Sequence, residues 1–572
     1  MWILRDFDGA LKFVEWLIVN SLERGFFPVL GDLISKVAFL RKADHLLYQN
    51  WIRNIESIPP LTVKDSEQYD VILMLESADS PYLQEILEKT VLMNWVGVLL
   101  VILPIGVPRN MIKDNTIKNG EKIRLLDFDA YRAEFLRNDA KNNIALIHTL
   151  GLIEAAWVPK IDALLGMGAD LVLSDHDLLG KEGFRYDPVL KPGFSRELIF
   201  DPAYAPCLFL SKELFRRCLE NNPLENNNSD HGAVDVMANI MSSAEMPKHL
   251  EHVLIHLVEK PLSWLTLQKP FVEKDRKFNL RTHLSRFPEV YKAPTTPPLV
   301  SIIIPIRDNI TLLIDCVRSV KKHQYKSKYE IVVLDNQSSD PQTLSWLKKS
   351  EAAGVITCLK CDFDFNWSKL NNVGIEHATG DVFVLLNNDT LVITPDWLDR
   401  LAALALEEDV GVVGPLLLYP DGCIQHAGVV VGYGGFADHL YLGEPVSNRS
   451  DEHFVSPFVR RDVSACTGAC QVFTKKFYQE NGPFNERLRV TGDIEFCIRA
   501  QNRGFRNLYD PSVSLYHLES KTRTKGLSKE EKEELKSCLG ELTVLDDQYF
   551  NSNLSRSSRS PMFTLLKREE TG

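Results

Sequence analysis

One stretch of the chain combines an unbroken apolar run with a polar end. Residues 382–386 read Val-Phe-Val-Leu-Leu, and Asn387, Asn388 and Asp389 follow directly. A short run that is apolar without alternation is typical of a strand covered on both faces. Open α/β sheets bind their ligands at the carboxyl ends of such strands. The stretch therefore predicts a ligand-binding sheet edge; a strand that ends in a plain Asx turn is the alternative.

Strands, helices and polar loops alternate over both halves of the chain. Apolar runs predict strands at 299–305 and 330–334 in the second half, and at 71–75, 98–103 and 171–173 in the first half. Helical patterns lie between them, which is typical of α/β domains with largely parallel sheets. We divide the chain into a helical segment (1–60), a first α/β domain (61–275), a Pro-rich linker (276–298), a second α/β domain (299–525), and a C-terminal helix with a tail expected to be disordered from about 551 (526–572).

Two segments could associate with a membrane. Apolar positions at helical spacing make residues 1–60 amphipathic, which suits a membrane surface or, as the favoured interpretation, a helical cap on the following domain. Residues 91–108 imitate a membrane span, but glycines and prolines interrupt them. We interpret that segment as the end of a helix followed by a buried strand.

Charge and cysteine content narrow the class of protein. The chain of 572 residues carries a formal net charge of −12, which argues against nucleic acid as a partner. The 10 cysteines are scattered and no signal peptide opens the chain, so we expect a cytoplasmic protein with reduced thiols. The pairs Cys358/Cys361 and Cys466/Cys470 could bind zinc together, but small buried thiols are the favoured interpretation.

Several motifs in a fixed order run through residues 300–523. Together they closely resemble family 2 glycosyltransferases of the GT-A fold, and most of all the branch that builds bacterial surface polysaccharides, including rhamnosyltransferases. The segments that carry the resemblance are Val-Ser-Ile-Ile-Ile-Pro (300–305), Val-Leu-Asp-Asn-Gln-Ser-Ser-Asp (333–340), Phe-Asn-Trp-Ser-Lys-Leu-Asn-Asn-Val-Gly (365–374), Leu-Leu-Asn-Asn-Asp-Thr (385–390), Thr-Gly-Ala-Cys (467–470), Gly-Asp-Ile-Glu (492–495) and Tyr-His-Leu-Glu (516–519).

The resemblance implies a donor site for a nucleoside-diphosphate sugar. It assigns the nucleotide base to Asp335, and it implies that the donor site also includes Pro305, Asn336, Ser338, Asp340, Lys369, Asn371, Asn387 and Asn388. Lys369 could equally lie on a solvated helix face.

A diphosphate leaving group needs a cation to neutralise its developing charge. Asp389 is the natural ligand for Mn²⁺ or Mg²⁺; Asn387 replaces the first of the two acids usual in this family's metal motif. The resemblance implies His517 as a further ligand, with a surface or capping histidine as the alternative.

An acceptor hydroxyl needs a general base near the anomeric carbon. Asp493 and Glu495 are the candidates, and they fall in the first turn of a predicted helix. The resemblance assigns the base to Asp493 and a supporting role to Glu495. The alternative for Asp493 is a charge that complements the helix dipole.

The first half also resembles a GT-A domain, in degenerate form. We therefore expect two GT-A domains in tandem, of the Rossmann-like nucleotide-diphospho-sugar transferase type. Asp230 to Asp235 resembles the base region, but the counterpart of Asn387–Asp389 is expected near Pro159–Ile161, where no metal motif stands. Lys160 there could supply a positive charge instead, but we expect the repeat to be architectural.

The leading hypothesis is an inverting, metal-dependent glycosyltransferase. Its donor would be UDP- or dTDP-linked, and its acceptor a growing surface glycan or a lipid-linked oligosaccharide at the inner face of the cell membrane. A sugar-nucleotide pyrophosphorylase would carry a Gly-rich loop where residues 305–308 read Pro-Ile-Arg-Asp. A non-catalytic glycan-binding or scaffold protein suits the first half, but it does not explain Asp389 and Asp493.

Overall fold

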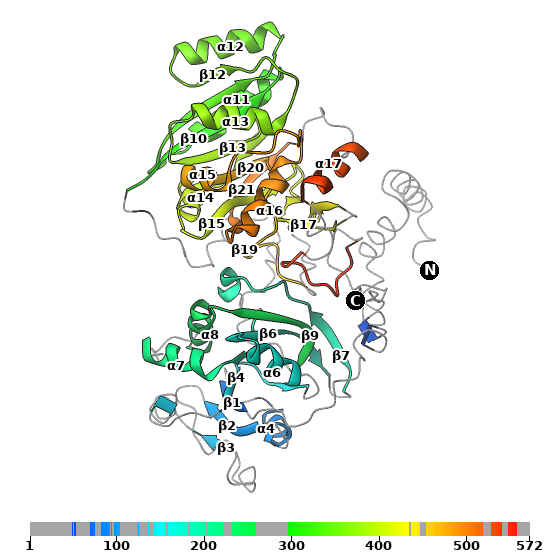
Figure 1. The fold of residues 1–572 in the computed structure, drawn as a ribbon. Coiled ribbons are helices and arrows are strands. Elements are labelled where there is room, and N and C mark those ends of the chain that lie inside the picture. The colour runs from blue at the N-terminus through cyan, green and yellow to red at the C-terminus, as the bar shows by residue number, and fades with distance from the viewer. Residues whose placement is uncertain are drawn as a thin grey trace, which may run out of the picture.

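The computed structural model describes most of residues 69–102, 142–221, 232–258, 296–446 and 454–518, together with 528–539, 547–556 and short pieces at 48–49, 51–52, 123–125 and 135–136 (Figure 1). Most of the predicted helical segment 1–60 and of the linker 276–298 lies outside these residues. Within them, no helix has the length and apolar character needed to cross a membrane.

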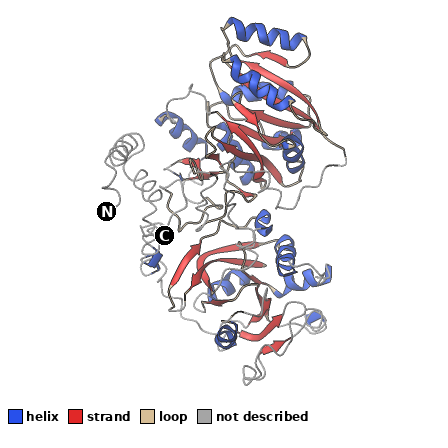
Figure 2. Cartoon of the chain, turned by 180° about the vertical axis from the view of Figure 1, so that it is seen from behind, coloured by secondary structure: helices blue, strands red, loops and turns tan. Residues whose placement is uncertain are grey.

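The second half folds into one mixed sheet with helices on both faces (Figures 1 and 2). Its strand order is β12-β11-β10-β13-β20-β15-β21-β14. The strands are β10 (Leu299–Ile306), β11 (Lys328–Asp335), β12 (Thr357–Lys360), β13 (Val382–Leu386), β14 (Thr390–Val392), β15 (Val410–Leu418), β20 (Cys470–Thr474) and β21 (Arg506–His517). The helices are α11 (Ile310–Lys321), α12 (Pro341–Ala352), α13 (Trp367–His377), α14 (Trp397–Ala405), α15 (Lys475–Asn481) and α16 (Gly492–Asn502).

The predicted strand 382–386 lies at the centre of this sheet. All of β13 is buried, because its side chains alternate between two hydrophobic clusters. Leu385 packs with Ile303 on the face that carries α13, and Val384 packs with Ile302 on the opposite face. Burial on both faces explains why this sequence is apolar without alternation.

The first half contains a sheet of the same design. Its order, β3-β2-β1-β4-β8-β6-β9-β5, matches the second sheet strand for strand, and the paired strands that the two sheets share run in the same relative directions. These strands are β1 (Tyr69–Met74), β2 (Val96–Ile102), β3 (Ile123–Leu125), β4 (Asn143–Ile147), β5 (Gly151–Ile153), β6 (Leu171–Leu179), β8 (Cys207–Leu210) and β9 (Pro247–Leu257). The chain is therefore a structural tandem of two α/β units.

The matching strand orders of the two sheets correct one predicted correspondence between the halves. Because β4 takes the place of β13, the residues that follow β4 are the counterparts of Asn387, Asn388 and Asp389. They are His148, Thr149 and Leu150. The predicted counterpart at Pro159–Ile161 is wrong, since those residues belong to α6 (Val158–Gly166), which follows β5. The helix α8 (Gly232–Ser243) precedes β9 as α16 precedes β21, so residues 232–235 of the segment matched to the base region begin the equivalent helix, and Asp230 lies outside the described residues.

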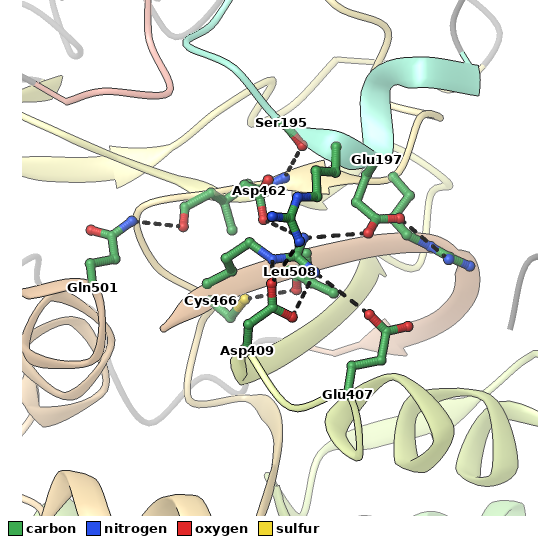
Figure 3. A network of polar contacts seen from close by, with 12 residues as sticks. Ser195, Glu197, Glu407, Asp409, Asp462, Cys466, Gln501 and Leu508 are labelled. Atoms are coloured by element: carbon green, nitrogen blue, oxygen red, sulfur yellow. Dashed lines mark hydrogen bonds and ion pairs between the residues drawn. The ribbon is translucent and has the colours of Figure 1, made fainter. Parts of the chain in front are cut away.

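A buried network of charges joins the two halves (Figure 3). Arg506, the first residue of β21, contacts Asp409 at 2.8 Å, Asp462 at 3.1 Å and Glu197 at 3.4 Å. Glu197 belongs to the first half, in the 3₁₀ helix η7 (Arg196–Phe200). The Asp462 amide also donates to Ser195 Oγ at 3.1 Å. Burial raises the pKa of Asp462 to about 6, against the pull of Arg506.

The C-terminal segment 547–556 makes a second connection between the halves. Asp547 accepts a hydrogen bond from the Val431 amide at 2.7 Å in the second half. Asn551 is fully buried and donates to Asp175 Oδ2 and to the Lys191 carbonyl, both at 2.9 Å, in the first half. The predicted disorder from about 551 is therefore wrong for residues 551–556.

Other local predictions fare better. The C-terminal helix is α17 (Lys529–Leu539), and Ser528 and Glu531 form the expected reciprocal capping box with N···O distances of 2.8 and 3.1 Å. All 10 cysteines are free thiols, and Cys466 and Cys470 are fully buried. Burial raises the pKa of both thiols, which disfavours the thiolate form that zinc would require.

We expect Arg506→Met to lower the free energy of unfolding by about 3 kcal/mol, because it leaves the buried Asp462 carboxylate without its partner. Urea unfolding of the full chain measures this change. Arg318→Met is the matched control: Arg318 pairs with Asp315 at 3.6 Å, with side chains 77% and 48% exposed, so its loss should cost less than about 1 kcal/mol. Equal effects of the two substitutions would contradict a stabilising role for the network.

Candidate active site

The pairing of β14 with β21 brings two predicted metal ligands together. The strands are antiparallel, and Thr390 lies opposite His517. Asp389 immediately precedes Thr390, and its Oδ1 atom lies 3.2 Å from His517 Nε2. The Asp389 carbonyl also accepts a hydrogen bond from the Leu518 amide at 2.9 Å. Two residues 128 positions apart in the sequence are thus held side by side by backbone geometry.

The His517 ring is held in one orientation. Its Nδ1 atom lies 2.6 Å from Gln425 Oε1, and an amide oxygen can only accept, so Nδ1 carries the hydrogen. The Nε2 lone pair then faces Asp389, with Asn387 Nδ2 at 3.3 Å as a donor. A histidine ligand in proteins commonly donates its other ring N–H to such an acceptor.

These side chains fit a divalent cation. Two donor atoms each bound at about 2.1 Å, at right angles to one another, lie ~3 Å apart, which agrees with the 3.2 Å between Asp389 and His517. The part of the chain that the structure describes contains no group of three or more His, Cys, Asp or Glu side chains suited to a metal. A cation at Asp389 and His517 would need ligands beyond these two side chains, and oxygen atoms of a bound ligand could supply them.

Asp493 is hydrogen-bonded to the segment 468–469, which also contacts Asn387 at the end of β13. Its Oδ2 atom accepts from the Gly468 amide at 2.7 Å, and its Oδ1 atom from the Ile494 amide at 2.9 Å. The next residue after Gly468, Ala469, accepts from the Asn387 amide at 3.0 Å. Gly468 lies so close to Trp367 that a Cβ atom there would stand 2.4 Å from the ring. The tight segment 468–469 thus bridges Asp493 and the end of β13.

Glu495 is engaged elsewhere. It is buried, and its carboxylate binds Arg499, one turn later in α16, at 2.8 and 3.1 Å. Arg499 in turn donates to the Pro483 carbonyl at 2.8 Å. This ion pair fastens α16 to the loop that precedes it, so the Glu495 carboxylate is held within the fold by Arg499.

The predicted nucleotide-binding residues gather around the loops that follow β11 and β12. Asp335 ends β11 and its Oδ1 atom accepts from the Ser338 amide at 3.0 Å. Asn336 Nδ2 donates to the carbonyls of Cys361 (3.0 Å) and Phe363 (2.7 Å). The Lys369 ammonium lies 4.4 Å above the centre of the Phe363 ring. Asn336 and Lys369 thus both contact Phe363, and Asp335 directly precedes Asn336.

The other predicted residues of this group mainly shape the backbone. Asp340 caps α12 through Thr343, and those hydrogen bonds lower the pKa of its carboxyl group. Asn371 donates to the Trp367 carbonyl within α13. Pro305, on β10, and Asn388, in the turn after β13, are partly buried.

Sequence reasoning missed two residues. Asp308 accepts from the amides of Ser339 and Asp340 at 2.8 Å and so closes the loop over the end of β10. Gln425, which orients His517, lies in β16 (Ile424–His426). No short motif marks either residue; only the pairing of distant segments reveals them.

In the first sheet, the two positions equivalent to Asp389 and His517 are apolar. Gly151 lies opposite Leu257 in the pairing of β5 with β9, as Thr390 lies opposite His517. Leu150 and Leu257 therefore occupy the places of Asp389 and His517, and both are buried. A leucine pair offers no donor atom to a cation.

A comparison with known protein families matches part of the second half. Residues 301–480 match the model described as glycosyl transferase family 2. This segment is a family 2 glycosyltransferase domain. It contains β10 to β13 and Asp389, whereas Asp493 and His517 follow it in the sequence.

Two curated relatives extend over both halves of the chain. An uncharacterized protein of Sinorhizobium fredii is 31% identical over 71% of this chain and 45% of its own length. The O-antigen biosynthesis protein RfbC of Myxococcus xanthus is 27% identical over 69% of this chain and 32% of its own length. The chain therefore spans less than half the length of either relative.

Solved structures with some similarity include that of GalNAc-T7 with UDP, GalNAc and Mn²⁺. It is 16% identical, with a TM-score of 0.33, over 42% of this chain and 48% of that one. Similarity at this level is too low to assign a fold or a ligand.

We expect Asp389→Ala to abolish Mn²⁺-dependent binding of a nucleoside diphosphate, because it removes the only carboxylate of the metal motif. Calorimetric titration with UDP and with dTDP, each with and without Mn²⁺, measures this loss, and circular dichroism checks the fold. Asp315→Ala, in the exposed part of α11, is the control. Unchanged Mn²⁺-dependent binding in Asp389→Ala would refute the metal assignment.

Proposed function

We propose that the protein is an inverting, metal-dependent glycosyltransferase that moves a sugar from a nucleoside-diphosphate donor to a growing surface glycan or lipid-linked oligosaccharide. The observation that carries the proposal is that the paired Asp389 and His517 and the hydrogen-bonded acid Asp493 are connected through residues 468–469 to the end of β13, in and next to the segment that matches family 2 glycosyltransferases.

The leaving group sets the first requirement. Asp389 and His517 would hold Mn²⁺ or Mg²⁺, which, when bound, neutralises the charge that develops on the departing diphosphate. With one carboxylate and one imidazole the protein supplies few ligands, so the donor's phosphate oxygens would complete the coordination. We therefore expect cation and donor to bind together.

The acceptor sets the second requirement. In the proposed step, Asp493 takes the proton of the acceptor hydroxyl while that oxygen attacks the anomeric carbon. The bond from this carbon to the diphosphate oxygen breaks, and its electron pair leaves with the nucleoside diphosphate. Attack from the face opposite the leaving group inverts the anomeric centre. The two amide donors, Gly468 and Ile494, keep the carboxylate aimed without neutralising it.

Asp335 would receive the nucleotide base, as the family resemblance implies. Ser338 engages Oδ1 of this buried carboxylate. The Lys369 ammonium, stacked on Phe363, would lie near the nucleotide as a positive charge. These roles rest on the contacts among the loops after β11 and β12. They leave the choice between UDP and dTDP open.

The name of the Myxococcus xanthus relative supports a surface polysaccharide as the product. A lipid-linked acceptor would bring the protein to the inner face of the cell membrane, where the amphipathic segment 1–60 is expected to bind peripherally. The first half would be architectural, because Leu150 and Leu257 replace the cation ligands.

A donor screen tests this function against the alternatives. The full chain is incubated with sugar nucleotides, Mn²⁺ and glycan acceptors, and released nucleoside diphosphate is measured. A transferase releases it in the presence of the right acceptor. A pyrophosphorylase would instead require pyrophosphate and release a nucleoside triphosphate, and a scaffold protein would release nothing.

We expect Asp493→Asn to lower kcat by about 10²- to 10⁴-fold, the usual contribution of a general base. Donor affinity should stay near wild type, because an amide oxygen can still accept from Gly468. Glu495→Gln is the comparison, and we expect it to affect mainly stability through the lost Arg499 pair. If Glu495→Gln loses activity while Asp493→Asn stays active, the general base is Glu495 and not Asp493.

A further inference from the structure

We propose that Gln425 is a positioning residue for His517: it holds the imidazole in the tautomer and orientation that present Nε2 to a divalent cation. The proposal rests on the proposed function, since it concerns the same cation site. It adds a residue from a separate strand that neither the sequence motifs nor the family match assigns.

The backbone places Gln425 for this contact. It is the middle residue of β16, which runs antiparallel to β15, and its side chain is buried. β15 in turn pairs with β21, the strand that ends at His517. The sheet therefore fixes both ends of the 2.6 Å hydrogen bond between Gln425 Oε1 and His517 Nδ1.

Hydrogen-bond chemistry makes the contact directional. The amide oxygen can only accept, so the hydrogen resides on Nδ1 and Nε2 keeps its lone pair. Asn387 gives an independent sign of the same tautomer, because its Nδ2 donor lies 3.3 Å from Nε2. Gln425 and Asn387 favour the Nδ1–H form, whereas the Asp389 carboxylate, 3.2 Å from Nε2, favours a hydrogen on Nε2 unless a cation lies between the two.

The neutral amide also suits the charge of the site. A neutral acceptor can orient the ring without adding a second negative charge beside Asp389. Asp389 then contributes the one negative charge of the Asp389–His517 pair. The remaining negative charge around the cation would come from the donor's phosphates. Loss of an outer partner of this kind typically weakens metal binding 10- to 100-fold.

Two substitutions distinguish the effect of the hydrogen-bond acceptor on cation binding from the effect of side-chain volume. Gln425→Leu keeps a similar size but removes the acceptor, and Gln425→Glu keeps an oxygen that can accept from Nδ1. Ile424→Val, at a buried neighbour in β16, is the matched control for local packing. His517→Ala gives the reference for complete loss of the ligand.

The readout is Mn²⁺ affinity, measured from the electron paramagnetic resonance signal of free Mn²⁺ in the presence of UDP or dTDP. We expect Gln425→Leu to weaken binding about 10- to 100-fold, Gln425→Glu to restore it to within a few-fold of wild type, and Ile424→Val to leave it unchanged. Urea unfolding of each variant checks that the chain remains folded.

The outcomes distinguish two failures. If wild type binds Mn²⁺ but Gln425→Leu binds equally well, the positioning role is wrong while the proposed function stands. If Gln425→Glu is as weak as Gln425→Leu, an acceptor at this position does not support binding, and the proposal is again overturned. If wild type itself shows no nucleotide-dependent Mn²⁺ binding, the proposed metal-dependent function fails as well.

Discussion

The register of β14 against β21 is the constraint on which the site depends. Placing Thr390 opposite His517 brings the preceding residue, Asp389, against the imidazole at the end of the longer strand. A shift of one residue would turn every side chain of β14 to the other face of the sheet. The fully buried β13, which leads into this turn, makes such a shift costly because its side chains fill both hydrophobic clusters.

The first half has the same sheet architecture but lacks the Asp389 and His517 side chains at the equivalent positions. The same strand order and the same terminal pairing recur, yet Leu150 and Leu257 stand at the two decisive positions. Its polar residues serve contacts to the rest of the chain instead: Glu197 reaches Arg506, and Asp175 binds Asn551. The same fold therefore occurs in one polypeptide with and without the paired Asp389 and His517. Buried charges that would be costly alone are satisfied by partners from the other half.

Several strands of the second half can be predicted from the sequence, because a strand buried on both faces appears as an unbroken apolar run. Parallel strands such as β10 and β13 appear as apolar runs, and Asp389 stands out at the end of one of them. The tandem arrangement was also predictable from the repeated alternation of strands and helices.

Contacts between distant segments could not be predicted in the same way. Gln425 meets His517 through two strand pairings across 92 residues, and no local pattern encodes that. The predicted counterpart of the metal motif at Pro159–Ile161 is wrong because the residues after β4, His148, Thr149 and Leu150, include no carboxylate or amide that marks the place in the sequence. The polar composition of the segment around Asn551 suggested disorder, but tertiary hydrogen bonds to Asp175 and Lys191 order it.

We propose that one cation site, formed by Asp389 and His517, serves the whole chain. Anomalous diffraction from crystals of the full-length protein grown with Mn²⁺ and a nucleoside diphosphate locates the cation. We expect a manganese peak between the Asp389 carboxylate and His517 Nε2, in contact with the diphosphate, and none at the β4–β5 edge of the first half. A peak at that edge, or a diphosphate bound far from Asp389, would contradict it.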